Sequence, residues 1–170
     1  MNNKVVLAFS GGLDTSFCVP YLKEKGYEVH TVMVNTGGFS AEEEKAIETR
    51  ALTLGAASHK NVNAVETYYS KGIRYLIYGN ILKNATYPLS VSSERVFQAL
   101  EVLRHVKEIG AGAVAHGSTG AGNDQVRFDI VFEILAPEVK IIAPVRDEGF
   151  TRQFEIDFLQ DRKSTRLNSS

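Results

Sequence analysis

The sequence is poor in cysteine, in net charge and in long apolar runs, and each shortage excludes a class of protein. Cys18 is the single cysteine among 170 residues, which excludes an internal disulfide, and no Cys/His spacing resembles a zinc site. With 19 basic and 20 acidic side chains the formal net charge is −1, so no overall positive field is available to hold a nucleic-acid backbone. We therefore expect no nucleic-acid partner, and any bound anion must be held by local groups.

The apolar run near the start covers only residues 5–9. It is too short for the apolar part of a signal peptide or for a membrane span. We therefore expect no membrane partner and, with a single cysteine, a reducing, cytoplasmic location.

Apolar, β-rich runs alternate with amphipathic stretches, which is typical of a parallel sheet covered by helices. The first run is unbroken by polar residues and should be buried on both faces. The pattern predicts strands at 4–9, 28–34, 58–62, 113–116 and 139–143. It predicts helices at 14–25, 40–54, 64–78, 92–109, 125–135 and 151–160. The fold class that follows is α/β, with an open, mostly parallel five-stranded sheet and helices on both faces.

Local signals refine the helix boundaries. Ser40 and Glu43 have the spacing of a capping box, and Gly110 is a C-terminal stop. Ser92 or the serine after it is a plausible N-cap for the long helix that Gly110 ends. Pro20 falls inside the first helix, where it should kink the helix or loosen its first turns, because it lacks a donor and crowds the preceding turn.

A glycine turn joins the first strand to the first helix, within the segment A-F-S-G-G-L-D-T-S at 8–16. Two glycines let the backbone approach a ligand, and the helix N-terminus adds unpaired N–H donors and a partial positive charge. Ser10, Thr15 and Ser16 add hydroxyls. The loop has no Walker lysine and is not G-x-G-x-x-G, which disfavours both of those nucleotide folds. A plain capping turn is the alternative.

This segment resembles the pyrophosphate loop of the ATP-pyrophosphatase superfamily. In that superfamily the loop holds the β- and γ-phosphates of ATP, and attack falls on the α-phosphorus. The resemblance implies adenylation of a substrate oxygen and release of pyrophosphate.

A second glycine loop follows the predicted strand at 113–116, in H-G-S-T-G-A-G-N-D-Q-V-R-F. Asn123 and Arg127 share one face of the helix that follows, and Arg127 offers a planar fork suited to a carboxylate. Asp124 can accept from an ammonium group, so the set fits an amino acid. The alternative is a helix cap with an Arg127 surface ion pair. His116, at a strand end, is interpreted as a packed residue.

Together the two loops resemble the argininosuccinate synthase family, whose signature the second loop closely matches. The resemblance runs from residue 4 to about 160 and includes Y-P-L-S-V-S at 87–92, similar to the family's citrulline-contacting segment. It implies an adenine nucleotide alpha hydrolase-like, Rossmann-like fold. It also implies condensation of citrulline with aspartate through a citrullyl-adenylate, giving argininosuccinate, AMP and pyrophosphate, with ATP and Mg2+ as cofactors. The family's role is in arginine biosynthesis and the urea cycle, and its full-length members are homotetramers.

The resemblance implies a binding role for each matching residue. ATP would contact Ala8, Phe9, Ser10, Gly11, Gly12, Leu13, Asp14, Thr15, Ser16, Val34 and Gly117. Citrulline would contact Tyr87, Ser92, Asn123 and Arg127, and aspartate would contact Thr119, Asn123 and Asp124. No catalytic residue is assigned, and Asp14 is a candidate metal ligand.

Three of these positions carry alternatives. Val34 replaces the family's alanine, although a backbone contact would survive that change. Tyr87 before a proline could instead cover a core edge, and Ser92 could instead cap a helix.

The expected organisation is a nucleotide-binding domain at 1–162 and a polar tail at 163–170. We interpret the tail as vector- or adapter-derived, with a genuine linker as the alternative. The family's C-terminal synthetase domain is absent from this sequence, so we expect the chain to bind ATP without making product. The rival functions are an ATP-binding module without turnover and another adenylating ligase with a pyrophosphate loop.

Overall fold

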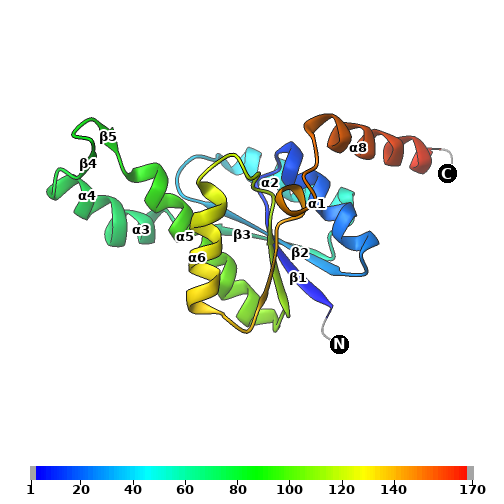
Figure 1. Ribbon diagram of the computed structural model, residues 1–170, viewed down its shortest axis with the longest axis horizontal. Helices are drawn as coiled ribbons and strands as arrows, with labels where there is room; N and C mark the ends of the chain where they lie inside the picture. Colours follow the sequence, from blue (N-terminus) through cyan, green and yellow to red (C-terminus); the bar gives the residue numbers. More distant parts are fainter. Residues whose placement is uncertain (1–2, 168–170) are drawn as a thin grey trace.

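The computed structural model describes residues 3–167, the last five by backbone alone. Its centre is a parallel five-stranded sheet in the order β3-β2-β1-β6-β7 (Figure 1). The strands are β1 (Lys4–Ala8), β2 (Glu28–Asn35), β3 (Ser58–Asn63), β6 (Ala113–His116) and β7 (Lys140–Ile142). The order runs outward from β1 in one direction and then resumes on its other side at β6. The crevice between the carboxyl ends of β1 and β6 is therefore the topological switch point, where open α/β sheets bind ligands.

Helices cover both faces of the sheet, as the alternating pattern predicts. The bounds are α1 (Leu13–Glu24), α2 (Ala41–Leu54), α5 (Ser90–Ile109), α6 (Asp124–Leu135), α7 (Pro144–Asp147) and α8 (Arg152–Leu167). Alternate residues of β1 separate the two cores: Val5 and Leu7 pack with α1 and α2, whereas Val6 packs with α5 and α6. These three side chains are fully buried, and burying each contributes about 1.5–3 kcal/mol.

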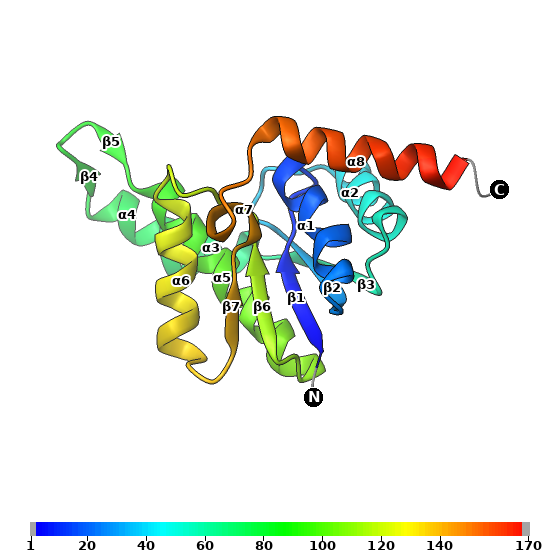
Figure 2. The same cartoon turned by 45° about the vertical axis from the view of Figure 1, so that its right-hand side comes forward.

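Helix α8 lies across α1 (Figure 2). Phe17 of α1 packs its ring against Phe150 and Phe158, with centroids 5.1 and 4.8 Å away. The helix predicted at 151–160 is therefore present, but it continues to Leu167. Residues 163–167, which we assigned to the tail, continue the helical backbone, and 168–170 lie outside the described residues.

A small arm stands away from the sheet, at the left of Figure 1. It contains α3 (Val65–Tyr68), a π-helical turn η1 (Tyr69–Ile73), α4 (Arg74–Tyr78) and a hairpin of β4 (Leu82–Lys83) and β5 (Tyr87–Pro88). The helix predicted at 64–78 is confirmed in extent but contains the π turn. The hairpin was not predicted, because each of its strands has only two residues and carries no alternating pattern.

Helix boundaries confirm some local signals and correct one. Ser40 and Glu43 form the predicted capping box, and Gly110 ends α5 in the left-handed conformation. The N-cap prediction for Ser92 or its neighbour is wrong, because α5 begins at Ser90 and its N-cap, Leu89, makes no side-chain cap bond. Helix α1 runs without a break through Pro20, which is buried. Within residues 3–167, no helix is both long and apolar enough to cross a membrane.

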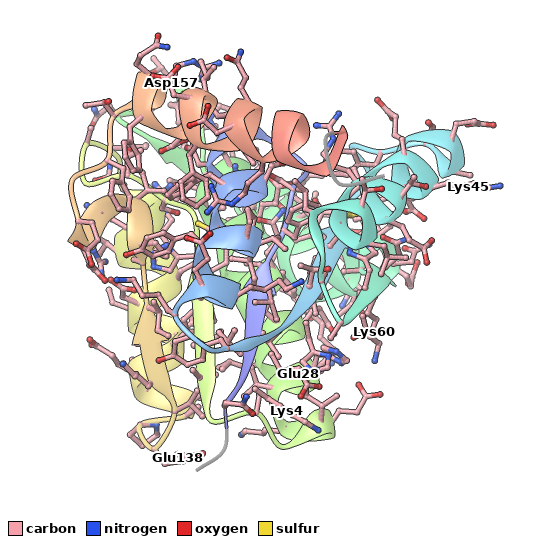
Figure 3. The ribbon with its side chains drawn as sticks, turned by 90° about the vertical axis from the view of Figure 1, so that its right-hand side faces the viewer. Lys4, Glu28, Lys45, Lys60, Glu138 and Asp157 are labelled. Carbon is pink, nitrogen blue, oxygen red and sulfur yellow. The ribbon has the colours of Figure 1, made fainter. Side chains whose placement is uncertain are left out.

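The two edges of the sheet differ in what they carry. Lys4 and Glu28, at the starts of β1 and β2, lie on the side of the molecule opposite α8 (Figure 3). The loops that follow β1 and β6 leave the other edge, towards α8. The two glycine loops, which contain most of the candidate binding residues, therefore lie at the same edge of the sheet.

Candidate functional site

A cavity of about 840 Å³ opens at the switch point. Both glycine loops line it, together with the end of β2 and the first turn of α6. The two loops touch: a Cβ atom on Gly117 would lie only 3.0 Å from Thr15 Cγ2 and 3.1 Å from the Thr15 backbone nitrogen. Both loops therefore lie at the same edge of the sheet, after the paired residues Ala8 and His116.

The first loop presents backbone donors to this cavity. Gly11 adopts φ +75°, and a side chain there would meet Ile47 at 3.0 Å, so glycine is required on both counts. Gly12 is the N-cap of α1 and provides no side-chain cap. The N–H groups of the first turn, from Leu13 to Thr15, thus have no acceptor within the helix. These are the unpaired donors that the sequence predicts at this helix end, and such donors are suited to an anion.

The hydroxyl groups of the first loop divide between cavity and backbone. Ser10 and Thr15 line the cavity, with their hydroxyl oxygens 3.4 Å apart. Ser16 is buried, and its hydroxyl donates to the Gly11 carbonyl at 3.4 Å. Arg50 of α2 also donates to that carbonyl. Since both donors neutralise an oxygen that would repel a phosphate, Ser16 and Arg50 support the loop.

The second loop is tied down by a chain of hydrogen bonds that starts at His116. This side chain is 1% exposed; its Nδ1 accepts from the Ser118 N–H at 3.2 Å, and its Nε2 lies 2.9 Å from Asp129 Oδ1. Asp129 also pairs with Arg146 of α7. Arg146 reaches Gln125, which donates to the carbonyls of Gly120 and Gly122 at 2.9 and 3.3 Å. Both ends of the loop are therefore held from α6.

Burial lowers the pKa of His116 below its ordinary value, although Asp129 acts in the opposite direction. The imidazole is neutral at neutral pH. Because Nδ1 accepts a hydrogen bond, the single proton resides on Nε2 and is donated to Asp129. The interpretation of His116 as a packed residue is confirmed, and its ring also stacks on Phe128.

Two arginines converge on Asp124 at the start of α6. Arg127 Nη1 and Arg95 Nε lie 2.6 and 3.0 Å from its carboxylate oxygens, and Arg127 Nη2 donates to Ser92 Oγ at 2.9 Å. Burial alone would raise the pKa of Asp124, but hydrogen bonds and charge from the two arginines outweigh it and hold the pKa below its usual value. The ion pair considered for Arg127 is present, yet Arg127 and Asp124 both line the cavity.

The cavity brings together most residues assigned from sequence. Those lining it are Ala8, Phe9, Ser10, Gly12, Leu13, Asp14, Thr15, Val34, Gly117, Thr119, Asn123, Asp124 and Arg127. Three assigned residues lie outside the lining: Gly11, Ser16 and Ser92. The Gly11 carbonyl accepts from Ser16 and Arg50, and the Ser92 hydroxyl accepts from Arg127, which does line the cavity. Tyr87 is on the arm, 53% exposed, and does not line the cavity. The alternative that Tyr87 covers a core edge is wrong, because its ring is exposed.

Helix α8 contributes a buried acid next to the first loop. Glu155 is 1% exposed, and its Oε2 has no hydrogen-bond partner among the described residues. Burial, the charge of Asp14 and a hydrogen bond with Asp14 raise the pKa of Glu155 to about 7. Burial and the same two acids also raise the pKa of Cys18 well above its usual range, so this thiol is not a nucleophile.

Sequence reasoning missed the cavity's outer residues. Arg95 and Glu94 come from α5, and Arg152 comes from α8. No local motif marks them, because they reach the cavity through tertiary packing. Among the residues described, no group of three or more His, Cys, Asp or Glu side chains is arranged to hold a metal ion.

The sheet order and the touching glycine loops define an α/β domain of the Rossmann-like, adenine nucleotide alpha hydrolase-like class whose first glycine loop carries no lysine. A family model narrows this class. The model described as "Arginosuccinate synthase N-terminal HUP domain" matches residues 4–164. The chain therefore belongs to the argininosuccinate synthase family.

Curated relatives support this membership. Argininosuccinate synthases from Xanthomonas campestris pv. campestris, Pyrobaculum aerophilum and Methanocaldococcus jannaschii are 44%, 44% and 43% identical, over 93%, 92% and 95% of this chain. The matched regions are 40%, 39% and 41% of those proteins. The chain thus spans about two-fifths of the length of the relatives it matches.

Solved structures share the fold at low identity. A predicted subunit of tRNA methyltransferase from Methanocaldococcus jannaschii has a TM-score of 0.58 at 20% identity, over 91% of this chain and 72% of that one. A glutamine-dependent NAD+ synthetase from Acinetobacter baumannii has a TM-score of 0.57 at 14% identity, over 73% of this chain and 23% of that one. These likenesses establish the fold alone.

Proposed function

We propose that this chain is the nucleotide-binding domain of an argininosuccinate synthase. The whole protein would condense citrulline with aspartate while ATP is cleaved to AMP and pyrophosphate. The observation that carries the proposal is the contact between Gly117 and Thr15, which unites two loops of different sequence type in one cavity. One loop offers donors for an anion, and the other presents the Arg127 and Asp124 pair.

ATP would lie across the switch point with its terminal phosphates on the first loop. The backbone donors from Leu13 to Thr15 and the hydroxyls of Ser10 and Thr15 support this position. The adenosine end would lie towards Val34, which lines the cavity from β2. The α-phosphorus would then face the second loop.

The second loop would hold the two amino acids. Arg127 and Ser92 would bind the carboxylate end of citrulline with Asn123, and Asp124 would bind the aspartate ammonium group with Thr119 and Asn123. Because Asp124 also holds Arg95, it stays anchored when Arg127 turns to a substrate carboxylate. The role of Tyr87 rests on the family resemblance alone, since the cavity does not include it.

The order of the two steps follows from the leaving groups, because AMP leaves the ureido carbon far more readily than an unmodified ureido oxygen does. The ureido oxygen of citrulline attacks the α-phosphorus, and the bond to pyrophosphate breaks. The aspartate amine then attacks the ureido carbon and loses a proton, and AMP leaves with the carbon–oxygen bonding pair. The domain's contribution is positioning and charge stabilisation by main-chain N–H groups.

Magnesium fits the donor set of the site. Mg2+ is usually bound by one or two carboxylates together with substrate phosphates. Asp14 lines the cavity beside the phosphate loop, with Glu155 next to it. We propose Asp14 as the protein ligand, and the ion would neutralise phosphate charge when bound.

Beyond the site, we propose residues 1–162 as the domain, a homotetrameric full-length protein and a cytoplasmic role in arginine biosynthesis and the urea cycle. The chain spans about two-fifths of its relatives, so the isolated 170 residues should bind ATP without making product. For residues 163–170 we propose a vector- or adapter-derived tail, with a genuine linker as the alternative, and the downstream genomic sequence distinguishes the two.

The test uses calorimetry on this chain and turnover in a chimera. The chimera replaces the matching region of the Xanthomonas campestris relative with residues 1–162. We expect the chain to bind ATP, and the chimera to catalyse citrulline-dependent ATP–pyrophosphate exchange. ATP binding with no exchange in an assembled chimera would favour a binding module. Exchange with another acceptor would favour a different adenylating ligase, and cleavage at the γ-phosphate would overturn the proposal.

A further inference from the structure

The first glycine loop contains no cation to balance a triphosphate. Between residues 8 and 16 the only charged side chain is Asp14, which is acidic. Two of the arginines that line the cavity, Arg95 and Arg127, both pair with Asp124. The Mg2+ proposed at Asp14 would offset only part of the charge of a triphosphate, and Asp14 is itself acidic, so a side-chain cation beside the backbone donors would add stabilisation.

Arg152 is placed to supply that charge. It is the first residue of α8, it is exposed, and it lines the same cavity as Asp14 and Thr15. Among the described residues no hydrogen bond or ion pair commits its guanidinium to another side chain. Its charge is nonetheless felt at Glu155, one turn further along α8, where it lowers that group's pKa. Arg152 is therefore close to the acidic pair behind the loop and free to bind an anion.

The start of α8 is held firmly over the first loop. Phe150 and Phe158 pack on Phe17 from either side of this turn, and Phe150 and Phe154 stack at 4.7 Å. Asp157 lies on the outer side of α8 (Figure 3), where it accepts from Gln153 at 2.8 Å and does not neutralise Arg152. The backbone that carries Arg152 is thus fixed at the cavity rim while its side chain stays available.

We propose that Arg152 is the side-chain cation of the phosphate site and binds the terminal phosphates of a nucleoside triphosphate held by residues 8–16. This inference rests on the proposed function and assigns a ligand contact to α8. A guanidinium fork matches two phosphate oxygens and remains charged at all relevant pH values. On the leaving pyrophosphate it would stabilise the charge that develops as the bond to the α-phosphorus breaks.

The experiment compares ATP, inorganic pyrophosphate and AMP by calorimetry with the 170-residue chain. Arg152→Ala should weaken ATP and pyrophosphate binding about 10- to 100-fold, the loss of one charge-assisted contact, and leave AMP binding unchanged. Arg152→Lys should recover part of the loss, because it keeps the charge without the fork. Arg162→Ala is the matched control: Arg162 lies on the same helix, pairs with Glu24 and stacks on Phe158, outside the cavity.

Each outcome decides the matter. An equal loss for AMP, or the same loss in Arg162→Ala, would mean that Arg152 acts only through the fold of α8. Unchanged pyrophosphate binding by a folded Arg152→Ala variant would remove Arg152 from the site and leave the proposed function standing. Failure of the parent chain to bind ATP or pyrophosphate would overturn both.

Discussion

His116 donates through Nε2 to Asp129 at 2.9 Å, and this bond fixes which imidazole nitrogen faces the second glycine loop. The other nitrogen can then accept from the Ser118 N–H. Protonation of the ring would turn that acceptor into a donor and break the contact. The loop's anchoring is therefore sensitive to pH.

Burial lowers the pKa of His116 below its ordinary value of about 6.5, so below that pH the unfolded chain binds more protons than the folded one. The stability that neutral His116 contributes is complete above about pH 6.5 and is lost as the pH falls towards the folded pKa. His116→Gln keeps a donor for Asp129 but does not titrate. In urea unfolding, the parent should have the higher free energy of unfolding at pH 7, and its advantage over the variant should shrink at pH 5. A difference that does not change with pH would contradict this role of His116.

Glu155 should show the opposite sign. Its pKa is raised to about 7, so the folded state keeps a proton that the unfolded chain releases near the ordinary glutamate value. Stability from this group is lost as the pH rises through that window. Glu155→Gln, which mimics the protonated acid, should match the parent at pH 4.5 and be the more stable protein at pH 8. Glu138→Gln, at an exposed turn, is the control, and an equal gain there would remove Glu155 as the cause.

Gly117→Ala should force the two glycine loops apart. The new Cβ would lie 3.0 Å from Thr15 Cγ2 and 3.1 Å from a backbone nitrogen that cannot move cheaply. We expect a loss of about 1–3 kcal/mol in the free energy of unfolding and weaker ATP binding. Gly120→Ala in the same loop meets only Arg146, at an ordinary 3.7 Å, and should change neither. Equal effects in both variants would show that the loop contact is unimportant.

Arg127→Ala should abolish citrulline-dependent ATP–pyrophosphate exchange in the chimera while ATP binding stays near normal. The side chain lines the cavity from α6, where its hydrogen bonds go to Asp124 and Ser92, and Asp124 keeps Arg95 when Arg127 is lost. Arg104→Ala, an exposed arginine of α5 paired with Glu101, is the control. Full exchange activity in Arg127→Ala would remove this residue from the citrulline site.

The sequence was sufficient for the sheet and for both loops, because those features are local. An unbroken apolar run before S-G-G identifies β1, and the capping box at Ser40 fixes the start of α2. The N-cap prediction at Ser92 was also based on a local preference, because serine is common at helix N-caps. The helix instead starts at Ser90, and the Ser92 hydroxyl accepts a hydrogen bond from Arg127.

The missed residues act across long sequence separations. Arg50 reaches Gly11 from 39 residues away, and Arg152 and Glu155 come from the last described helix. Nothing in their neighbourhood distinguishes them from surface charges. The packing of Phe17 on α8 brings Arg152 and Glu155 to the first loop, and periodicity cannot predict that pairing.

Ala8 and His116 are paired in the register of β1 and β6, so both glycine loops leave the sheet at the same height. The step from one loop to the other is then a single interstrand spacing, about 4.8 Å. That spacing is a constant of the hydrogen-bond ladder, which side-chain changes in the surrounding helices leave untouched. A nucleotide bound on the first loop, as we propose, would thus meet its acceptor on the second loop at a separation fixed by backbone geometry.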